Sequence, residues 1–294
     1  MPLLAVPNVS TAGDEETLGR LAEAFGRAAR VLDFHTDADH GRSVFTLAGE
    51  AVDLAESLLA GAAEAIEAID MSSYAGVHPA IGALDVCPLV WLREEDRGPA
   101  RTEAVAIAGQ IGGLGVPVFL YGELAHEPGR AERAYFRNGG LTELWLRMEG
   151  GELRPDFGPP LPHPRAGATL VTARPPLAAF NVELEGADLD AARVVAAEVR
   201  EAGGGLPGVR AIGLMLSSGR AQISTNVHDP LTTTLATVVA DVRRLAAPLG
   251  ARPVAAELVG LIPAGALVDY PADVPIRGFD PERHVIERRL AAGD

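Results

Sequence analysis

One histidine stands where the sequence could support proton transfer. The stretch SSYAGVHPAIGALDVCP (residues 72–88) places His78 in a turn, between Gly76 and Pro79, just before a strongly apolar run. Loops at the end of a buried strand commonly carry binding and catalytic residues. A neutral imidazole in such a loop can accept and return a proton near pH 7. His78 is therefore a candidate acid/base, and a purely structural hydrogen bond within the turn is the alternative.

A second polar cluster falls in the stretch LDFHTDADHGR (residues 32–42). Its acidic, imidazole and guanidinium side chains are Asp33, His35, Asp37, Asp39, His40 and Arg42. The spacing does not match a motif with a defined metal assignment, such as H-E-x-x-H, so no metal site is predicted. Two interpretations remain. Either the aspartates cap their own backbone in a polar turn, or a carboxylate and an imidazole face a binding cleft.

Two further segments combine polar groups with a distinctive backbone composition. PDFGPPLPHPRAGATL (residues 155–170) is rich in proline and glycine and contains Arg165. It is either a rigid connection or a loop that presses its backbone against a planar ligand, because glycine permits close approach. In RAQISTNVHD (residues 220–229), Gln222 and Asn226 alternate with apolar residues, as in a strand with one wet face. If that face lines a cleft, the two amides offer donors and acceptors to a polar ring.

Composition excludes several classes of function. All 25 basic residues are arginine, which excludes lysine chemistry such as a Schiff base or a Walker lysine. The net charge of −15 argues against a nucleic-acid partner. The N-terminus lacks the basic and apolar regions of a signal peptide, and no apolar run is long enough to span a membrane. With Cys87 as the single cysteine, these features predict a cytoplasmic protein without internal disulfides.

The elements that must position these residues follow the same order in two halves. In the first half, strands are predicted at 3–9, 31–35, 42–48, 83–92 and 116–121, and helices at 14–29, 51–69 and 101–114. In the second half, strands are predicted at 180–184, 209–216, 220–227 and 254–263, with helices at 188–202 and from Asp229 onwards. A last, exposed helix is expected at 279–290.

Both halves therefore have the order β-α-β-β-α-β, which is the ferredoxin-like arrangement. The predicted fold class is α/β (α+β), with two such subdomains, residues 1–173 and 174–294, joined near two prolines. A sheet with both helices on one face leaves its other face uncovered. We expect the two uncovered faces to look toward each other across a substrate cleft.

Several segments together resemble the formiminotransferase family. They are VPNVS, the pair Asp33 and Arg42, IDMSSYAGVHPAIGALDVCPLV, VPVFLYGELA, PDFGP, GATLVTARPPLAAFNVEL, AQISTN and ELVGLIP. The most specific feature is H-P-x-x-G-A-L-D-V-C-P followed later by P-D-F-G-P. The resemblance runs from about residue 3 to residue 270, nearly the whole chain.

The resemblance implies a fold and a reaction. The fold is two α/β subdomains that enclose a folate site, in a homodimer. The reaction moves a formimino group from N-formimino-L-glutamate to tetrahydrofolate, and it gives 5-formiminotetrahydrofolate and L-glutamate in histidine degradation. Tetrahydrofolate is a co-substrate and no metal takes part. His78 matches the catalytic histidine of the family.

The resemblance also implies binding residues. The positions implied to bind substrate or folate are Asn8, Arg42, Asp156, Gly158, Pro159, Arg165, Gln222 and Asn226. Members of the family carry a catalytic aspartate two residues after the position of Asp33, where this chain has His35. Asp37 or Asp39 is expected to take over the part of that aspartate, beside the positively charged formimino group. Arg174 is expected to be a solvated surface charge.

Three alternatives stay open from the sequence alone. The first is formyl transfer between 5-formyltetrahydrofolate and glutamate. His35 in place of the aspartate suits this reaction, because a formyl oxygen needs no anionic partner. The second is a folate-binding protein without turnover. The third is a metal-dependent hydrolase built on residues 35–40.

Overall fold

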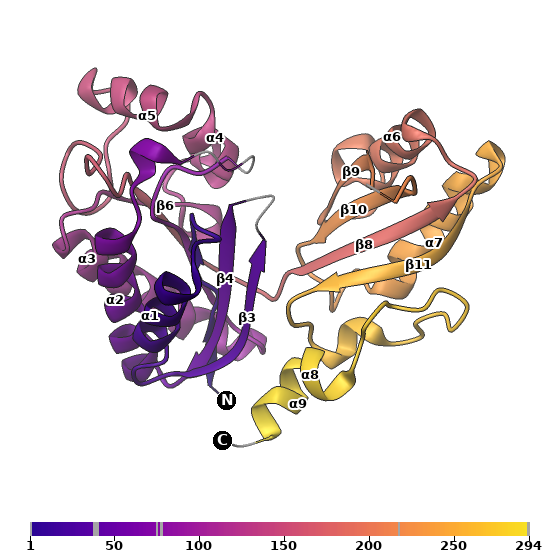
Figure 1. Cartoon of the computed structure of the whole chain (residues 1–294), viewed down its shortest axis with the longest axis horizontal. Coiled ribbons are helices and arrows are strands. Elements are labelled where there is room, and N and C mark those ends of the chain that lie inside the picture. The colour runs from indigo at the N-terminus through magenta and orange to yellow at the C-terminus, as the bar shows by residue number, and fades with distance from the viewer. Residues whose placement is uncertain (1, 38–40, 75, 77–78, 217, 293–294) are drawn as a thin grey trace. The chain divides into compact units, whose positions relative to one another are not determined.

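The fold is described by a computed structural model that covers residues 2–37, 41–74, 76, 79–216 and 218–292. The chain divides into two compact units, Met1–Arg174 (unit 1) and Pro175–Asp294 (unit 2), each with its own sheet and hydrophobic core (Figure 1). Both units mix helices and strands, so the predicted α/β fold class is confirmed. The cleft expected between the two uncovered faces stays a prediction.

Unit 1 begins with the predicted β-α-β-β-α-β order. Its elements are β1 (Leu3–Ala5), β2 (Asn8–Val9), α1 (Glu15–Phe25), β3 (Arg30–Asp37), β4 (Arg42–Gly49), α2 (Ala51–Ala68) and β5 (Leu84–Val90). The first strand is split into β1 and β2 at Pro7, which has no N–H to donate to a ladder. The carbonyl of Pro7 still accepts a hydrogen bond from the Phe45 N–H at 3.0 Å, so the pairing resumes beyond the break.

The chain then extends this sheet with two parallel strands. The added elements are α3 (Arg97–Gly113), β6 (Val118–Leu120), α4 (Arg133–Arg137), α5 (Gly140–Glu149) and β7 (Thr169–Arg174). Across the sheet the order is β3, β4, the split strand β1/β2, β5, β7 and β6, with β5, β7 and β6 parallel to one another. Helices α4 and α5 are additions to the expected elements.

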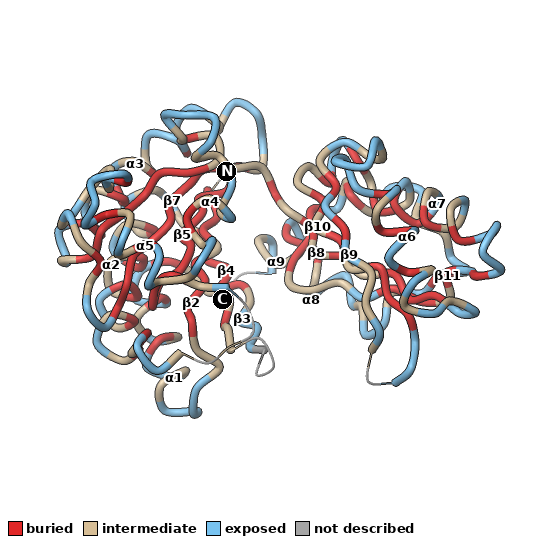
Figure 2. The backbone as a smooth tube through the Cα atoms, turned by 90° about the horizontal axis from the view of Figure 1, so that it is seen from above, coloured by how far each residue is buried: buried red, intermediate tan, exposed pale blue. Residues whose placement is uncertain are grey.

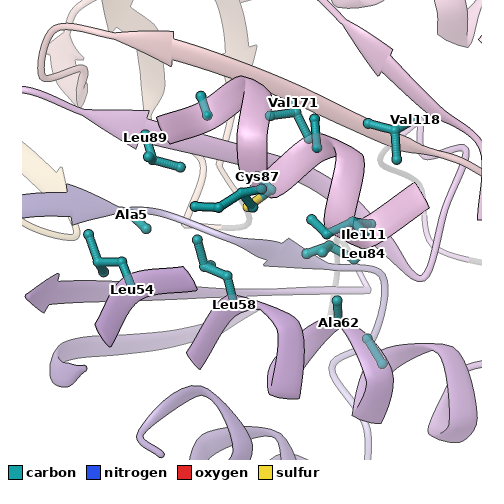
Figure 3. Close-up of a cluster of buried hydrophobic side chains, with 14 of the residues drawn as sticks. Ala5, Leu54, Leu58, Ala62, Leu84, Cys87, Leu89, Ile111, Val118 and Val171 are labelled. Carbon is teal, nitrogen blue, oxygen red and sulfur yellow. The ribbon is translucent and has the colours of Figure 1, made fainter. Parts of the chain in front are cut away.

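The main core of unit 1 lies between the sheet and helices α1, α2 and α3. Leu54 and Leu58 of α2 belong to the same apolar cluster as Cys87 of β5 (Figure 3). A Cβ atom at Gly61 would lie 2.1 Å from the ring of Phe25, so this close approach of α1 and α2 requires glycine. Burial raises the pKa of the Cys87 thiol to about 12, which makes this cysteine a packing residue rather than a nucleophile.

The opposite face of the same sheet is covered in part by α4 and α5. Phe119 of β6 packs against Phe136 of α4, with ring centroids 5.1 Å apart, and Leu144 of α5 joins the same buried cluster. Clusters therefore cover both faces of the sheet at β6 and β7, and these strands are buried (Figure 2).

Unit 2 has the predicted ferredoxin-like topology without extension. Its elements are β8 (Ala178–Glu185), α6 (Leu189–Val199), β9 (Val209–Met215), β10 (Ala221–Val227), α7 (Leu235–Ala246), β11 (Arg252–Val259), α8 (Pro281–His284) and α9 (Ile286–Ala291). The strands are ordered β11-β8-β10-β9 and every pairing is antiparallel. Asp188 caps α6 by accepting the Ala191 N–H at 2.8 Å. The core of unit 2 packs between this sheet and helices α6 and α7.

Two predictions for unit 2 were wrong. The helix expected from Asp229 begins only at Leu235, with Thr234 as its cap. The Asp229 carboxylate instead accepts the N–H groups of nearby residues and closes a turn, which is a common alternative to helix initiation for aspartate.

The second error concerns the C-terminal segment. It forms two short helices instead of one exposed helix, and Val285 between them and Ile286 at the start of α9 are buried. Ile262 donates its N–H to the His284 carbonyl and accepts the Ile286 N–H, both at 2.9 Å, which ties the segment to unit 2.

Candidate active site

One face of the unit 1 sheet carries a group of buried charges. On β4, Phe45 and Leu47 belong to the core under α1, α2 and α3. Successive side chains of a strand point to opposite faces, so Arg42, Val44 and Thr46 point to the other face. We call this other face the polar face of unit 1.

A one-residue irregularity in β5 places an acidic residue on the polar face. Asn8 of β2 pairs with Val86, whereas the next residue, Val9, pairs with Leu84. Asp85 is therefore an extra residue on β5, which is the arrangement of a β-bulge. Bulges redirect a side chain relative to the regular alternation, and here the redirected side chain is a carboxylate.

The Asp85 carboxylate is buried and shared between a loop and a helix. Its Oδ1 accepts the N–H of Ile81 at 2.9 Å, and its Oδ2 pairs with Nη2 of Arg137, the last residue of α4. Ile81 lies three positions after His78 in the sequence. Asp85 therefore ties the end of the His78 loop to α4. A buried charge of this kind requires such partners.

Arg42 and Asn8, both implied by the family resemblance, contact each other. The Arg42 Nε donates to Oδ1 of Asn8 at 2.8 Å, and its Nη2 donates to the same oxygen. The Asn8 Nδ2 donates to the Val6 carbonyl at 2.7 Å, which orients the amide. The Arg42 guanidinium is thus held in a fixed direction on the polar face.

The electrostatic surroundings of Arg42 are crowded with like charge. Burial is the main cause that lowers the pKa of Arg42 to about 10, and the guanidinium groups of Arg137 and Arg133 lower it further. The Asp85 carboxylate opposes this shift. Arg42 stays charged at neutral pH, because its pKa remains well above 7.

Arg174 at the end of β7 belongs to the same face. Burial also lowers the pKa of Arg174 to about 10, with Arg133 contributing and Tyr121 opposing. The same two residues, Arg133 and Tyr121, also shift the pKa of Arg42, so the neighbourhoods of Arg42 and Arg174 overlap. The expectation that Arg174 is a solvated surface charge was therefore wrong. The position of Arg174 in the sequence does not indicate that its guanidinium is desolvated.

The loop before β5 also reaches the polar face. Burial raises the pKa of the Tyr74 hydroxyl, and the Asp85 carboxylate adds to this effect while Arg42 and Arg137 oppose it. Tyr74 therefore belongs to the electrostatic surroundings of Arg42, Asp85 and Arg137. On the other side of His78 in the sequence, the Ile81 N–H donates to Asp85 at 2.9 Å.

The β3–β4 hairpin meets that loop. A Cβ atom at Gly41 would lie 2.9 Å from the Gly76 Cα, so the two backbones are in contact, and Gly41 also has a φ of +62°. His78 and Asp39, the proposed acid/base and one proposed carboxylate, lie outside the described residues. The contact seen is the one between Gly41 and Gly76.

The remaining candidates of the β3 cluster lie along the edge of the same sheet. Asp37 is paired in register with Arg42, and His35 is paired with Val44. By strand alternation His35 shares the polar face with Arg42, and its side chain is exposed. The strand register therefore places residues 35 and 37 of the predicted cluster opposite Val44 and Arg42.

Within the proline- and glycine-rich loop, the predicted folate-binding residues have local structural partners. The Asp156 Oδ2 accepts the Leu120 N–H at 2.8 Å and an Arg130 N–H at 2.6 Å. Gly158 has a φ of +83°, and a Cβ atom there would lie 2.4 Å from the Val116 carbonyl oxygen. These contacts hold the loop against β6. The folate-binding role of the loop stays a prediction.

Arg165 has partners outside the polar face. Its Nε lies 3.4 Å from Oδ2 of Asp70, and its Nη2 donates to the Glu67 carbonyl at the end of α2, at 3.5 Å. The side chain is about half exposed. The structure therefore does not bring Arg165 into contact with the described residues around Arg42. Its folate-binding role, like that of Pro159, stays a prediction.

In unit 2, the predicted amides lie on the sheet face opposite α6 and α7. Gln222 is buried and Asn226 is half-buried, and Ile223 between them belongs to the core. Gln222 is paired in register with Glu183, a buried carboxylate. Arg277 donates to Glu183 at 2.8 Å. The polar face predicted for β10 thus lies beside charged side chains, those of Glu183 and Arg277.

Two kinds of feature are missing from the described part of the chain. No three His, Cys, Asp or Glu side chains gather there in a group that could hold a metal ion. Asp39 and His40 fall outside that part. Within it, no helix is long and apolar enough to cross a membrane.

The sequence analysis missed Asp85 and Arg137. One signal was present for Asp85: a single acidic residue inside the apolar run ALDVCPLV must find a partner once the strand is buried. No signal was present for Arg137, because it lies on a short helix that pattern analysis did not detect, 52 residues from Asp85.

The polar face of unit 1 has the charge of an anion site. The pKa of Arg42 is lowered by Arg133 and Arg137, that of Arg174 is lowered by Arg133, and Asp85 is the carboxylate beside Arg42 and Arg137. Arginine binds carboxylates through paired N–H groups. The fold and the site thus define an α/β protein with a cluster of arginine side chains on one face of its first sheet.

Comparisons with known proteins specify this class. The family model for the formiminotransferase domain, N-terminal subdomain, matches residues 3–174, and the formiminotransferase domain model matches residues 179–273. The chain is 34% identical to the glutamate formimidoyltransferase of Streptococcus pyogenes, over 97% of each chain. It is 33% identical to that of Thermoplasma acidophilum, over 97% of this chain and 96% of the other. It is 37% identical to the formimidoyltransferase-cyclodeaminase of Sus scrofa, over 91% of this chain and 51% of that protein. The chain belongs to the formiminotransferase family.

Proposed function

We propose that the chain is a glutamate formimidoyltransferase, which moves the formimino group of N-formimino-L-glutamate to tetrahydrofolate. The products are 5-formiminotetrahydrofolate and L-glutamate. The observation that carries the proposal is the full-length similarity to two proteins of that name. The buried arginines of the polar face support it, because glutamate and folate both carry carboxylates.

In the proposed reaction, the protein moves protons and holds the substrates in place. The folate nitrogen attacks the formimino carbon and gives a tetrahedral intermediate. His78 takes the proton from that nitrogen and delivers it to the departing glutamate nitrogen, so one imidazole serves as base and then as acid. Asp37 or Asp39 stabilises the positive charge on the formimino nitrogens. Arg42 binds a substrate carboxylate, and its fixed direction contributes by orientation.

Several finer features belong to the same proposal. Tetrahydrofolate is a co-substrate that contacts residues 155–166 and the amides of β10, and no metal takes part. The working protein is a cytoplasmic homodimer of the histidine-degradation pathway. Fluorescence titration with folate and sedimentation of the purified protein test these points separately from turnover.

The test of the function is turnover of N-formimino-L-glutamate with tetrahydrofolate, followed by release of L-glutamate. His78→Ala is expected to lose at least about a hundredfold in kcat, which is the usual cost of removing a general acid/base. His284→Ala is the matched control, because this histidine bonds to the backbone of Asp280 in its own turn in unit 2. Wild-type protein that binds folate but shows no turnover contradicts the proposal and favours a binding protein.

A second function is supported by His35. An imidazole stands where the family carries an aspartate, and it lies on the polar face in register with Val44. Formyl transfer from 5-formyltetrahydrofolate to glutamate needs no carboxylate beside the transferred group. Parallel assays with the two donors decide between these functions, and the preferred donor is the one with the higher kcat/KM.

A further inference from the structure

Arg137 is nearly buried, and one of its hydrogen-bond donors is unused. Its side chain is 10% exposed, and Nη2 pairs with the Asp85 carboxylate, which is itself 2% exposed. The Nε–H is buried and has no hydrogen-bond partner among the described residues. A buried donor left without an acceptor is costly, so such a group calls for an explanation.

A second arginine–aspartate pair of unit 1 also has a buried Nε–H without an acceptor in the described part of the chain, and there the surrounding side chains account for it. Arg130 is 12% exposed, pairs with Asp156 at 2.6 Å, and also has a buried Nε without a partner among the described residues. Its guanidinium, however, lies over the rings of Phe119 and Phe136, 5.8 and 5.6 Å from their centroids. Aromatic faces provide a favourable environment for a guanidinium.

Arg137 has a different environment. Instead of aromatic rings, its described neighbours include the guanidinium of Arg42, whose pKa it lowers, and the hydroxyl of Tyr74. Arg133 adds a further positive charge to the same neighbourhood. Like charges gathered in a desolvated place repel one another, and a bound anion relieves that repulsion.

The Nε–H of Arg137 offers a donor to such an anion. Arg42 uses Nε and Nη2 on Asn8, and Arg137 uses Nη2 on Asp85. The Nε–H of Arg137 is a donor beside a second, nearby guanidinium. A carboxylate oxygen is the acceptor that suits a guanidinium N–H, and an amide oxygen is a weaker one.

We propose that Arg137 binds a carboxylate of the glutamate moiety of the donor through its Nε–H, next to Arg42, and so selects a dicarboxylic amino acid. This inference rests on the proposed function, in which L-glutamate is the leaving product. It assigns Arg137 as a specificity residue and gives Asp85 the role of holding the guanidinium in place.

The test is the binding of L-glutamate and its two amides, measured by isothermal titration without turnover. The probes are L-glutamate, L-glutamine, which lacks the γ-carboxylate, and L-isoglutamine, which lacks the α-carboxylate. In wild-type protein, at least one amide is expected to bind about tenfold or more weakly than L-glutamate, as expected for loss of a charge-assisted hydrogen bond. In Arg137→Lys, which keeps a cation beside Asp85 but lacks the Nε–H, that ratio is expected to fall to about 1–2.

Two further variants distinguish a role of Arg137 in ligand selectivity from a purely structural role. Arg130→Lys is the matched control, because Arg130 belongs to a similar buried pair. It is expected to keep the wild-type ratios of L-glutamate affinity to L-glutamine affinity and to L-isoglutamine affinity. The double variant Asp85→Asn with Arg137→Gln removes both charges of the pair and leaves no buried ion unpaired, and it is expected to lose the ratio as Arg137→Lys does.

The inference is overturned if Arg137→Lys keeps both ratios, or if Arg130→Lys loses them to the same extent. Failure of the proposed function has a different signature. In that case L-glutamate binds with the expected selectivity, but no formimino group is transferred to tetrahydrofolate.

Discussion

The two sheets of this protein share a β-α-β-β-α-β core, extended in unit 1 alone, but carry different charge arrangements on the face away from their main helices. In unit 1, Asp85 pairs with the nearly buried Arg137 and acts on Arg42, and Arg133 acts on both Arg42 and Arg174. In unit 2, the buried carboxylate of Glu183 pairs with Arg277 and lies 3.8 Å from Arg220. Those two arginines are 57% and 44% exposed, so water screens their charge.

The difference indicates that burial, rather than the number of charges, distinguishes the proposed anion site of unit 1 from the charged face of unit 2. A half-exposed arginine is already solvated and gains little from a new carboxylate. A desolvated arginine gains more, because the anion replaces lost hydration and relieves the repulsion between neighbouring cations. On this argument the proposed site can attract a dicarboxylate although the protein has a net charge of −15.

The strongest test of this contrast compares Arg42→Met with Arg277→Met. Arg42→Met is expected to lower kcat/KM for N-formimino-L-glutamate by about a hundredfold or more, since truncating a buried hydrogen-bonded charge typically costs 2–5 kcal/mol. Arg277→Met is expected to change it by less than about threefold, as for an exposed ion pair. Steady-state kinetics of both variants provide the measurement, and equal losses would remove the distinction between the two faces.

Stability provides the next comparison, between Asp85→Asn and Glu183→Gln. Asp85→Asn leaves the nearly buried Arg137 without a counter-ion and is expected to lower the free energy of unfolding by about 3–5 kcal/mol. Glu183→Gln is expected to lower it by about 1–2 kcal/mol, because its partners can turn to water. Urea denaturation of each variant measures the difference, and a larger loss for Glu183→Gln would contradict the assignment of the desolvated site to unit 1.

Proton uptake on binding sharpens the comparison further. Burial lowers the pKa of Arg42 and of Arg174 to about 10, so near pH 10 each is partly deprotonated in the free protein. A bound carboxylate favours the charged form and raises the pKa, so L-glutamate binding near pH 10 is expected to take up protons. Its affinity should decrease as the pH rises through 10. Titration calorimetry in buffers of different ionisation enthalpy measures the uptake, which Arg42→Met should reduce.

The lowered pKa values of Arg42 and Arg174 also affect the free energy of unfolding. The pKa of each arginine is lower in the folded chain than its ordinary value of 12.5, so the unfolded chain binds more protons between pH 10 and 12.5. The cost of burying the two charges is fully present below pH 10 and declines above it. These residues therefore reduce the stability of the free protein at neutral pH, as expected of groups kept for binding.

The smallest expected effect concerns the helix-covered face of unit 1. Cys87 is buried there and burial raises the pKa of its thiol to about 12, so a thiol-specific reagent at pH 8 should leave native protein unlabelled. After denaturation the same reagent should label this single cysteine. Rapid labelling of native protein would show that the core under α2 and α3 opens readily.

The sequence predicted the regular parts of the fold well. The apolar stripe over residues 51–69 and the continuous apolar run over 83–92 correspond to α2 and β5, because both patterns extend over many residues. The start of α7 was misplaced because Asp229 can close a turn as readily as it caps a helix. Helices α4 and α5 carry no comparably strong pattern.

The site was predicted only where a short motif carries it. Arg42 and Asn8 were found through the family resemblance, and the structure shows them in contact. Asp85 and Arg137 were missed because their pairing depends on a helix brought back over the sheet from 52 residues away. A local pattern does not encode the desolvation of Arg174 either, because that depends on which elements cover the strand end.

The bulge in β5 makes the site sensitive to chain length as well as to composition. Asp85 faces the arginines only because one more residue stands in β5 than in the facing part of β2. Removing that residue would restore a regular ladder and leave the strand with its apolar character intact. In a scan of single-residue deletions along residues 84–90, loss of Asp85 should cost about as much stability as Asp85→Asn, because Arg137 loses its counter-ion in both, whereas the other deletions also shift the strand register. One extra residue in β5 therefore sets both the pairing of the strand and the charge beside the arginines.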